Sequence, residues 1–220
     1  MDHLDIMELV RARHSVRSYQ ERKLSPETAA LIRAELDKIN EQSGLHIQLM
    51  EETEGVFGGL FSRVIGWKHV PCYLALVGQE GPDLEERCGY YGEQLVLFLQ
   101  SIGLNTCWVG MFKAAASKAE VRPGEKLVVT IVLGYGTDGG KLRRSKTPEQ
   151  VSDVREMPDW FRAGVECALL APTAINQQKF RISLDGDIPT VTAAGNGPFI
   201  KVDLGIVKYH FEIGSGKKLP

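Results

Sequence analysis

The strongest constraint in this chain is one long amphipathic segment enclosed by apolar runs of a different period. From Leu84 to Ile102, apolar residues recur at steps of four and three, which keeps one helix face apolar for about five turns. Pro71–Val77 before it and Leu127–Leu133 after it are continuous apolar runs. Runs without alternation are typical of central strands covered on both faces. We therefore expect helices packed on a sheet.

Other segments add helices and strands in alternation. Ser25 is a plausible helix N-cap with Pro26 in the first turn and Gly44 as the stop, and Leu45–Leu49 alternates like a half-buried strand. The stretch 138–159 is polar and contains two prolines, so it is predicted to be a linker or an extended excursion. Helices are also expected at 4–12, at 158–170 and from Phe199 to Ile213 ending at Gly214, with strands at Thr106–Phe112, Phe180–Leu184 and Thr190–Ala194. This order indicates an α/β or α+β domain.

Composition and charge exclude several classes of partner. The 220 residues carry a net charge of −2, which argues against general binding of nucleic acid or of an anionic membrane. We find no apolar run close to the ~18–20 residues that span a bilayer, and charged residues in the first twenty exclude a signal peptide. The four cysteines form no CxxC pair, so no zinc site or disulfide framework is predicted. A soluble, cytoplasmic protein is expected.

One glycine motif has a formal match that its context does not support. Residues 134–139 read GYGTDG, which fits the GxGxxG pattern after a strand. A dinucleotide-binding fold needs that turn to open directly into an apolar-faced helix, so that the helix N-terminus meets the pyrophosphate. Here a basic loop, GKLRRSK, and then Pro148 follow. The motif is therefore not interpreted as a dinucleotide site.

Two further segments are suited to binding a flat, anionic ligand. Residues 13–17 (RHSVR) combine two guanidinium groups with an imidazole and a hydroxyl, a donor set that suits a phosphate or a carbonyl-rich ring edge. Residues 171–180 (APTAINQQKF) place uncharged amide and hydroxyl groups on a proline-stiffened turn. Taken alone, the first is equally consistent with a solvated basic turn, and the second with an ordinary helix-stop turn.

Together with two other segments, these motifs resemble the nitroreductase family of FMN-dependent oxidoreductases. The other two are GLNTCWVG at 103–110 and the strand ending LGY at 133–135, followed by Arg143 and Arg144. The resemblance covers most of the chain. It implies an α+β fold in which helices flank a central, mostly antiparallel sheet, and an FMN site that in the family usually lies between two subunits.

The resemblance also implies a set of cofactor-binding residues. One group would hold the phosphate, the ribityl chain and the pyrimidine edge of FMN: Arg13, His14, Ser15, Arg17, and Arg143 or Arg144 as a second cation at the phosphate. A second group would contact the isoalloxazine ring: the backbone of Trp108, Val109 and Gly110 near its reactive nitrogen, and Pro172, Thr173, Asn176 and Gln178 over its other side. No catalytic side chain and no metal ligand are implied.

The order of these motifs differs from that of the usual family. The proline–asparagine–glutamine turn ordinarily follows soon after the arginine–serine motif, whereas here it comes after residue 170, with Gln178-Lys179 in place of glutamine–proline. The segment VDLGI at 202–206 looks like a reduced copy of the helix that carries Tyr90–Gly103. We therefore expect two degenerate halves, 1–150 and a shorter 157–220, that imitate a dimer. One composite flavin site per chain follows, in a monomer or a loose homodimer.

The implied activity is the reduction of an electron-poor acceptor, of the nitroaromatic or quinone type, by NADH or NADPH through FMN. Ping-pong kinetics would follow, because donor and acceptor use the same flavin face. Two alternatives remain: a flavin-binding protein without turnover, for storage or sensing, and a binding module without flavin. The glycine-rich stretch 52–69, with Phe57, Phe61, Trp67 and His69, is predicted to be a long loop that could cover an acceptor.

Overall fold

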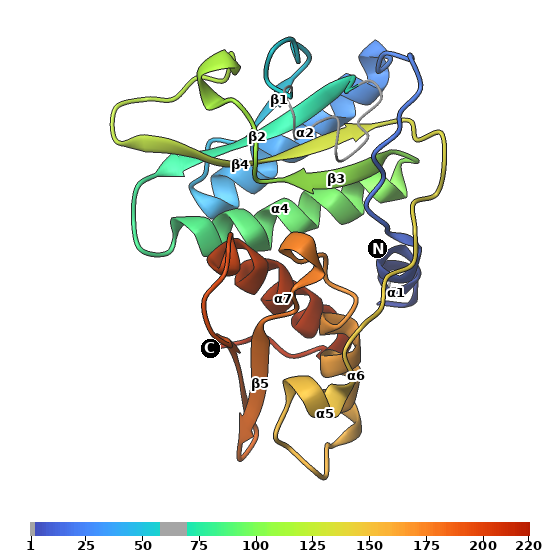
Figure 1. Ribbon diagram of the computed structural model, residues 1–220, viewed down its shortest axis with the longest axis vertical. Helices are drawn as coiled ribbons and strands as arrows, with labels where there is room; N and C mark the ends of the chain where they lie inside the picture. Colours follow the sequence, from blue (N-terminus) through green and yellow to red (C-terminus); the bar gives the residue numbers. More distant parts are fainter. Residues whose placement is uncertain (1–2, 58–69) are drawn as a thin grey trace. The chain divides into compact units, whose positions relative to one another are not determined.

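A computed structural model describes residues 3–57 and 70–220, which form two compact units (Figure 1). The first, called here the sheet unit, contains residues 13–84 and 95–142. The second, the helical unit, contains residues 1–12, 85–94 and 143–220. The units therefore interleave along the chain, because the first part of helix α4 (Leu84–Ser101) belongs to the helical unit and its last part to the sheet unit.

The sheet unit is built on a four-stranded antiparallel sheet in the order β1-β2-β4-β3. The strands are β1 (Gln48–Met50), β2 (Cys72–Gln79), β3 (Asn105–Val109) and β4 (Glu125–Gly134). The two continuous apolar runs of the sequence are β2 and β4, which pair with each other over their full lengths and are almost entirely buried. Their prediction as central strands is confirmed.

Helix α2 (Pro26–Ser43) has the ends that its sequence predicts. The Ser25 hydroxyl accepts a hydrogen bond from the Thr28 N–H at 3.1 Å, and Gly44 caps the other end with a φ of 65°. A left-handed residue at this position favours glycine, which has no Cβ to clash. The buried face of α2 consists of Ile32, Leu36 and Ile39 with two smaller residues, and the helix lies alongside the sheet (Figure 1).

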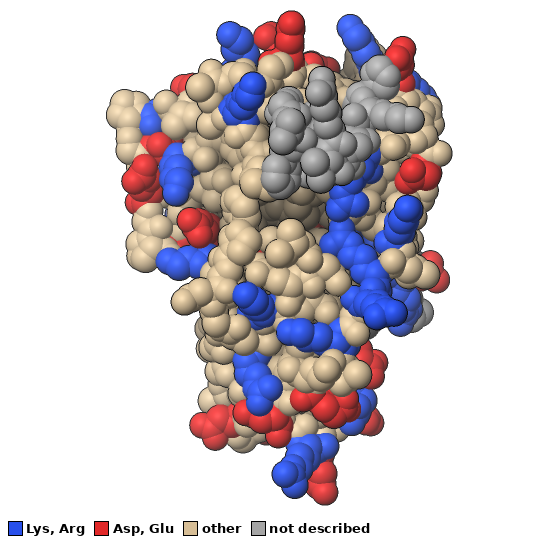
Figure 2. All heavy atoms as spheres, in the orientation of Figure 1, with Lys and Arg blue, Asp and Glu red and all other residues tan. Residues whose placement is uncertain are grey.

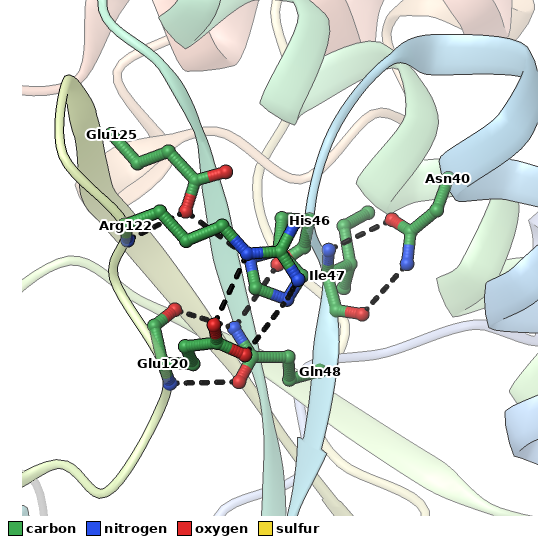
Figure 3. A network of polar contacts seen from close by, with 7 residues as sticks. All are labelled: Asn40, His46, Ile47, Gln48, Glu120, Arg122 and Glu125. Atoms are coloured by element: carbon green, nitrogen blue, oxygen red, sulfur yellow. Dashed lines mark hydrogen bonds and ion pairs between the residues drawn. The ribbon is translucent and has the colours of Figure 1, made fainter.

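The segment between α2 and β1 is less regular than the predicted strand over 45–49. The side chain of Asn40 accepts a hydrogen bond from the Ile47 N–H at 2.7 Å and donates one to its carbonyl oxygen at 2.9 Å (Figure 3). His46 contacts the Glu125 carboxylate, with 3.1 Å between Nδ1 and Oε2. Because these side chains occupy the polar groups of the segment, the regular strand begins only at Gln48.

A hydrophobic cluster lies within the sheet unit and ties its N-terminal segment to the sheet. Val16 and Tyr19 from that segment are buried together with residues of the strands and with Val56. The other members of the cluster are Tyr73, Ala75, Val77, Val109 and Val132. Burying an apolar side chain of this size contributes roughly 1.5–3 kcal/mol, so Val16 and Tyr19 help to fix the N-terminal segment on the sheet.

The helical unit joins helices to a two-stranded antiparallel hairpin. Its α-helices, besides the first part of α4, are α1 (His3–Ala12), α5 (Pro148–Val151), α6 (Asp159–Ala168) and α7 (Ile200–Ser215), and the hairpin consists of β5 (Phe180–Asp185) and β6 (Ile188–Ala193). Two sequence expectations need correction. The stretch 138–159 contains helix α5, and α7 continues past Gly214 to a cap at Gly216, whose φ is 67°.

Helix α7 packs unusually close to its neighbours because glycines remove the side chains at the crossings. A Cβ at Gly205 would lie 2.0 Å from the Glu86 carbonyl oxygen and 2.6 Å from the Tyr90 nitrogen. A Cβ at Gly89 of α4 would lie 2.0 Å from the Val202 oxygen. Real Cβ atoms do not approach backbone atoms so closely, so these positions of α4 and α7 require glycine.

Deeper in the same helix packing, His210 and Glu93 form a buried pair. Both side chains are fully buried, with 2.9 Å between His210 Nε2 and Glu93 Oε1. The other ring nitrogen lies 3.2 Å from the Cys167 carbonyl oxygen, which can only accept, so His210 donates there. Burial lowers the pKa of His210, but the bonds to Cys167 and Glu93 outweigh it and raise the pKa to about 9. His210 therefore joins α7 to α4 and α6 in the packing of the helical unit.

In the described residues, the surface charge and the hydropathy of the helices agree with the small net charge and the short apolar runs of the sequence. Lys and Arg side chains share the face drawn in Figure 2 with Asp and Glu, so neither sign occupies that face alone. No described helix is both long enough and apolar enough to cross a membrane.

Candidate functional site

The basic motif at 13–17 is held beside strand β3 by backbone pairing. Ser15 forms a parallel bridge with Thr106, and the Val16 N–H donates to the Thr106 carbonyl oxygen at 3.0 Å. Tyr19 then pairs with Gly136 in the segment that follows β4. The motif therefore lies next to the strand that carries Trp108 and Val109, so two of the segments predicted to bind the cofactor are brought together in the sheet unit.

A buried tyrosine and a glycine fix the course of the motif. The Tyr19 hydroxyl donates to the Val16 carbonyl oxygen at 2.8 Å, and burial raises its pKa well above the ordinary value, so it stays a donor. A Cβ at Gly140 would lie 2.7 Å from the His14 Cβ. The glycine-rich stretch after β4 thus packs its backbone against the motif, at a distance that a side chain at 140 would prevent.

The side chains of the motif differ in exposure. Arg17 is exposed, His14 and Ser15 are half-buried, and Arg13 is buried. At the other end of β3, Val109 is buried, whereas Trp108 and Gly110 are half-buried. Such guanidinium and hydroxyl donors on a closely packed backbone fit an anionic phosphate group.

In the helical unit, the proline-stiffened turn has a strained backbone. Ile175, Asn176 and Gln178 have φ values of 48°, 56° and 43°, in the left-handed region that favours glycine. For a β-branched residue such as isoleucine this conformation costs about 1–2 kcal/mol. The Ile175 side chain is nevertheless 87% exposed, so its own burial does not offset this cost. Strained residues of this kind are concentrated at functional sites.

Hydrogen bonds connect this turn to the basic segment around Arg144. The Gln178 amide is buried; it accepts from the Lys146 N–H at 2.9 Å and donates to the Ser145 hydroxyl at 3.0 Å. The Asn176 amide donates to the Arg144 carbonyl oxygen at 2.8 Å. The helical unit thus brings together the predicted turn (Pro172, Thr173, Asn176 and Gln178) and the predicted second cation (Arg143 or Arg144). The side chains of Arg143 and Arg144 are exposed.

Two residues of this region, Asp203 and its partner Gln177, were not singled out from the sequence. Asp203, in the first turn of α7, accepts hydrogen bonds from the Ala174 N–H at 2.9 Å and from the Gln177 amide at 2.7 Å. Burial raises the pKa of Asp203 to about 6, although the bonds from Gln177 and Ala174 act to lower it. The only sequence signal for Asp203 was its place as an acidic residue within the apolar repeat of a helix. That signal does not reveal that Ala174 and Gln177 are its partners.

The predicted site residues therefore form two groups. The first (Arg13, His14, Ser15, Arg17, Trp108, Val109 and Gly110) lies in the sheet unit, and the second (Arg143, Arg144, Pro172, Thr173, Asn176 and Gln178) lies in the helical unit. Most of the predicted cover over 52–69, including Phe61, Trp67 and His69, lies outside the described residues. Phe57 is described and packs edge-on against Tyr73 at 5.1 Å between ring centres.

Comparison with known proteins places nearly the whole chain in one family. A family model described as "Putative TM nitroreductase" matches residues 5–215. Among curated proteins, no relative matches this chain.

Solved structures share the fold. A "putative nitroreductase" from Thermotoga maritima matches with a TM-score of 0.65 and 23% identity, over 97% of this chain and 85% of its own. A "putative nitroreductase in complex with FMN" from Exiguobacterium sibiricum matches with a TM-score of 0.56 and 16% identity, over 68% of this chain and 97% of its own. A nitroreductase family protein from Streptococcus pneumoniae matches with a TM-score of 0.53 and 13% identity, over 68% of this chain and 99% of its own. The predicted α+β fold, with an antiparallel sheet flanked by helices, is confirmed.

Proposed function

The chain belongs to the family described as "Putative TM nitroreductase", and from this premise we propose that it is an FMN-dependent oxidoreductase. In this proposal NADH or NADPH is the reductant, and the acceptor is an electron-poor molecule of the nitroaromatic or quinone type. The Exiguobacterium sibiricum structure was solved with FMN, which supports the choice of cofactor. Because reductant and acceptor would occupy the same flavin face in turn, we expect ping-pong kinetics.

One observation carries the proposal: the pairing of Ser15 with Thr106. It places the basic motif beside β3, whose far end leads to Gly110. A ligand that needs a cationic end for a phosphate and a nearby backbone edge for a ring would use both segments. FMN has this combination of groups.

The chain's own residues would divide the work of binding. The Arg17 and Arg13 guanidinium groups and the Ser15 hydroxyl would neutralise the phosphate and bind the polar chain and ring edge. The Trp108–Gly110 backbone would lie against the ring, and the turn from Pro172 to Gln178 would cover its other side. The buried Gln178 amide already bonds to Lys146 and Ser145, so we assign it to holding the turn rather than to direct ring contact.

When bound, FMN supplies hydride transfer, so the chain needs no nucleophile or general base of its own. Positive charge beside the ring edge and the phosphate would favour the anionic reduced cofactor. The turn would exclude water from the covered side.

A single composite flavin site per chain is the second part of the proposal. The usual family carries the basic motif and the turn in each chain of a dimer. Here each occurs once, at 13–17 and 172–178, so one chain would build one site.

The test is an FMN titration of apoprotein carrying Arg17→Ala, Asn176→Ala or the control Arg33→Ala. Charge-assisted hydrogen bonds are worth about 1.5–3 kcal/mol, so Arg17→Ala should weaken binding by about one to two decades. Asn176→Ala should also weaken it, whereas Arg33, an exposed arginine paired with Glu51, should not matter. Unchanged affinity in Arg17→Ala would contradict the phosphate assignment, and unchanged affinity in Asn176→Ala would contradict the composite site.

Turnover is tested separately. The holoprotein should oxidise NADH or NADPH in the presence of a nitroaromatic or a quinone, with parallel lines in a double-reciprocal plot. FMN binding without such turnover would favour the alternative, a flavin-binding protein for storage or sensing.

A further inference from the structure

The turn at 173–178 adopts a conformation that its own residues do not favour. Three of its residues have positive φ values, and the exposed Ile175 among them is β-branched. A conformation of this kind persists only when surrounding contacts fix it. A group outside the turn must therefore hold it in this conformation.

The contacts converge on one carboxylate, that of Asp203. The Ala174 N–H lies 2.9 Å from its Oδ1 and 3.1 Å from its Oδ2, and the Gln177 Nε2 lies 2.7 Å from Oδ2. Ala174 and Gln177 stand on either side of the left-handed pair Ile175 and Asn176. One side chain thus bridges both ends of the strained pair.

The carboxylate is itself rigidly placed. Asp203 is only 7% exposed and lies in the first turn of α7. Two residues later, Gly205 packs against the backbone of α4 with no room for a Cβ. The Gln177 amide donates its other hydrogen to the Pro198 carbonyl oxygen at 3.0 Å, just before the same helix. The turn is therefore fastened to a helix that packs closely against α4.

We propose that Asp203 is a positioning residue that holds the turn 173–178 in its strained conformation, ready to cover the flavin ring. The part about the flavin rests on the proposed function, and the part about the turn does not. A turn held in place before the ligand arrives loses less conformational entropy on binding, which strengthens binding.

The turn provides its own reporters. The amide hydrogens of Ala174, Asn176, Gln177 and Gln178 are hydrogen-bonded, to Asp203, to the Thr173 and Ala174 carbonyl oxygens, and to the Thr173 hydroxyl. Hydrogen–deuterium exchange of a peptide covering 173–178, in the flavin-free full-length protein, therefore measures how firmly the turn is held. The variants are Asp203→Ala, Gln177→Ala and the double variant, with Asp187→Ala as control because Asp187 is an exposed carboxylate of the hairpin.

Asp203→Ala should lower the protection of the turn by about tenfold or more, because it leaves the Ala174 N–H and the Gln177 amide without their acceptor. Adding Gln177→Ala should lower it by much less than in the wild-type background, because the two residues act through one shared contact. Protection of α6 should stay within about twofold of wild type. Should Asp203→Ala fail to fold, Asp203→Leu, which removes both acceptor oxygens without emptying the site, should give a loss of the same kind.

Two results would overturn the positioning role. One is that Asp203→Ala protects the turn as well as the control Asp187→Ala does. The other is that Asp203→Ala and Gln177→Ala lower the protection independently of each other. A loss spread equally over α6 would also overturn it, since that pattern indicates general destabilisation.

FMN titration then tests the flavin part, with about a tenfold weaker affinity expected for Asp203→Ala. Loss of turn protection with unchanged FMN affinity would overturn that part. A wild-type protein that binds no FMN would contradict the proposed function instead, while the exchange experiment would still decide the role of Asp203.

Discussion

The basic motif at 13–17 and the turn at 173–178 are both candidate ligand-binding segments, but they are held by different means. The motif is fixed by main-chain pairing to β3 and by a buried tyrosine, and none of its residues has a positive φ. The turn has three left-handed residues and is fixed by the side chains of Asp203 and Gln178.

The difference determines how each segment should respond to mutation. Backbone pairing does not depend on which side chain is present, so the motif should keep its course when one of its side chains is changed. A turn held by side chains loses its shape when one of them changes.

The largest effect is expected at Gly205, in the helix α7 that also carries Asp203. An added Cβ would clash with the Glu86 oxygen at 2.0 Å, and overpacking of this kind costs about 3 kcal/mol or more. Gly205→Ala should therefore lower the unfolding free energy by that amount in urea denaturation. Gly139→Ala is the matched control in the sheet unit, where a Cβ would meet no atom within 4 Å, and it should cost less than about 1 kcal/mol. Equal costs would contradict the close helix crossing.

The support of the turn should respond to pH, whereas that of the motif should not. Burial raises the pKa of Asp203 from 3.8 to about 6, so the closed turn binds a proton more tightly than an open, hydrated one. The protonated form therefore stabilises the closed turn below pH 4, and this stability is lost as the pH rises through about 6. The change is on the order of 3 kcal/mol.

Hydrogen exchange, corrected for its intrinsic pH dependence, measures this effect. Protection of 173–178 should fall between pH 4 and pH 7, while protection of Val16 stays constant. In Asp203→Asn the fall should disappear. If the protection of 173–178 in the wild-type protein rises between pH 4 and pH 7, the predicted direction of the pH dependence is wrong.

A smaller effect is expected at Gln178. Gln178→Ala removes the acceptor of the Lys146 N–H and the donor to the Ser145 hydroxyl and the Leu169 oxygen. Leaving such groups unpaired should cost about 2 kcal/mol of unfolding free energy. Ser15→Ala should cost less than about 0.5 kcal/mol, because the pairing of Ser15 uses its backbone. A larger loss in Ser15→Ala than in Gln178→Ala would reverse the comparison.

The smallest effect is a gain of stability. Ile175→Asn places a residue that tolerates left-handed backbone at a φ of 48°, and it should raise the unfolding free energy by about 1 kcal/mol. Ile188→Asn is the control, since Ile188 is also exposed but has no positive φ. Stabilisation of both variants, or of neither, would show that backbone strain at 175 is not the cause.

Much of the architecture could be predicted from the sequence because it depends on local signals. The Ser25–Gly44 boundaries of α2 follow from capping, and the buried strands β2 and β4 follow from continuous apolar runs. Both signals act within a few residues of the chain. The strand expected at 45–49 was shortened because the Asn40 side chain competes for the backbone of Ile47, and that contact carries no pattern of its own.

The candidate site divides in the same way. The sequence by itself determined which residue types are available: guanidinium groups near the N-terminus, amides after residue 170, and glycines between them. Only the tertiary structure decided that Ser15 pairs with Thr106, that Gln178 is buried against Lys146, and that Asp203 accepts a hydrogen bond from Ala174. The physical reason is that periodicity and capping report a residue's nearest neighbours along the chain. Contacts between residues about thirty or ninety positions apart form only when the whole chain packs, and there they can hold even an isoleucine in a conformation that its own preferences oppose.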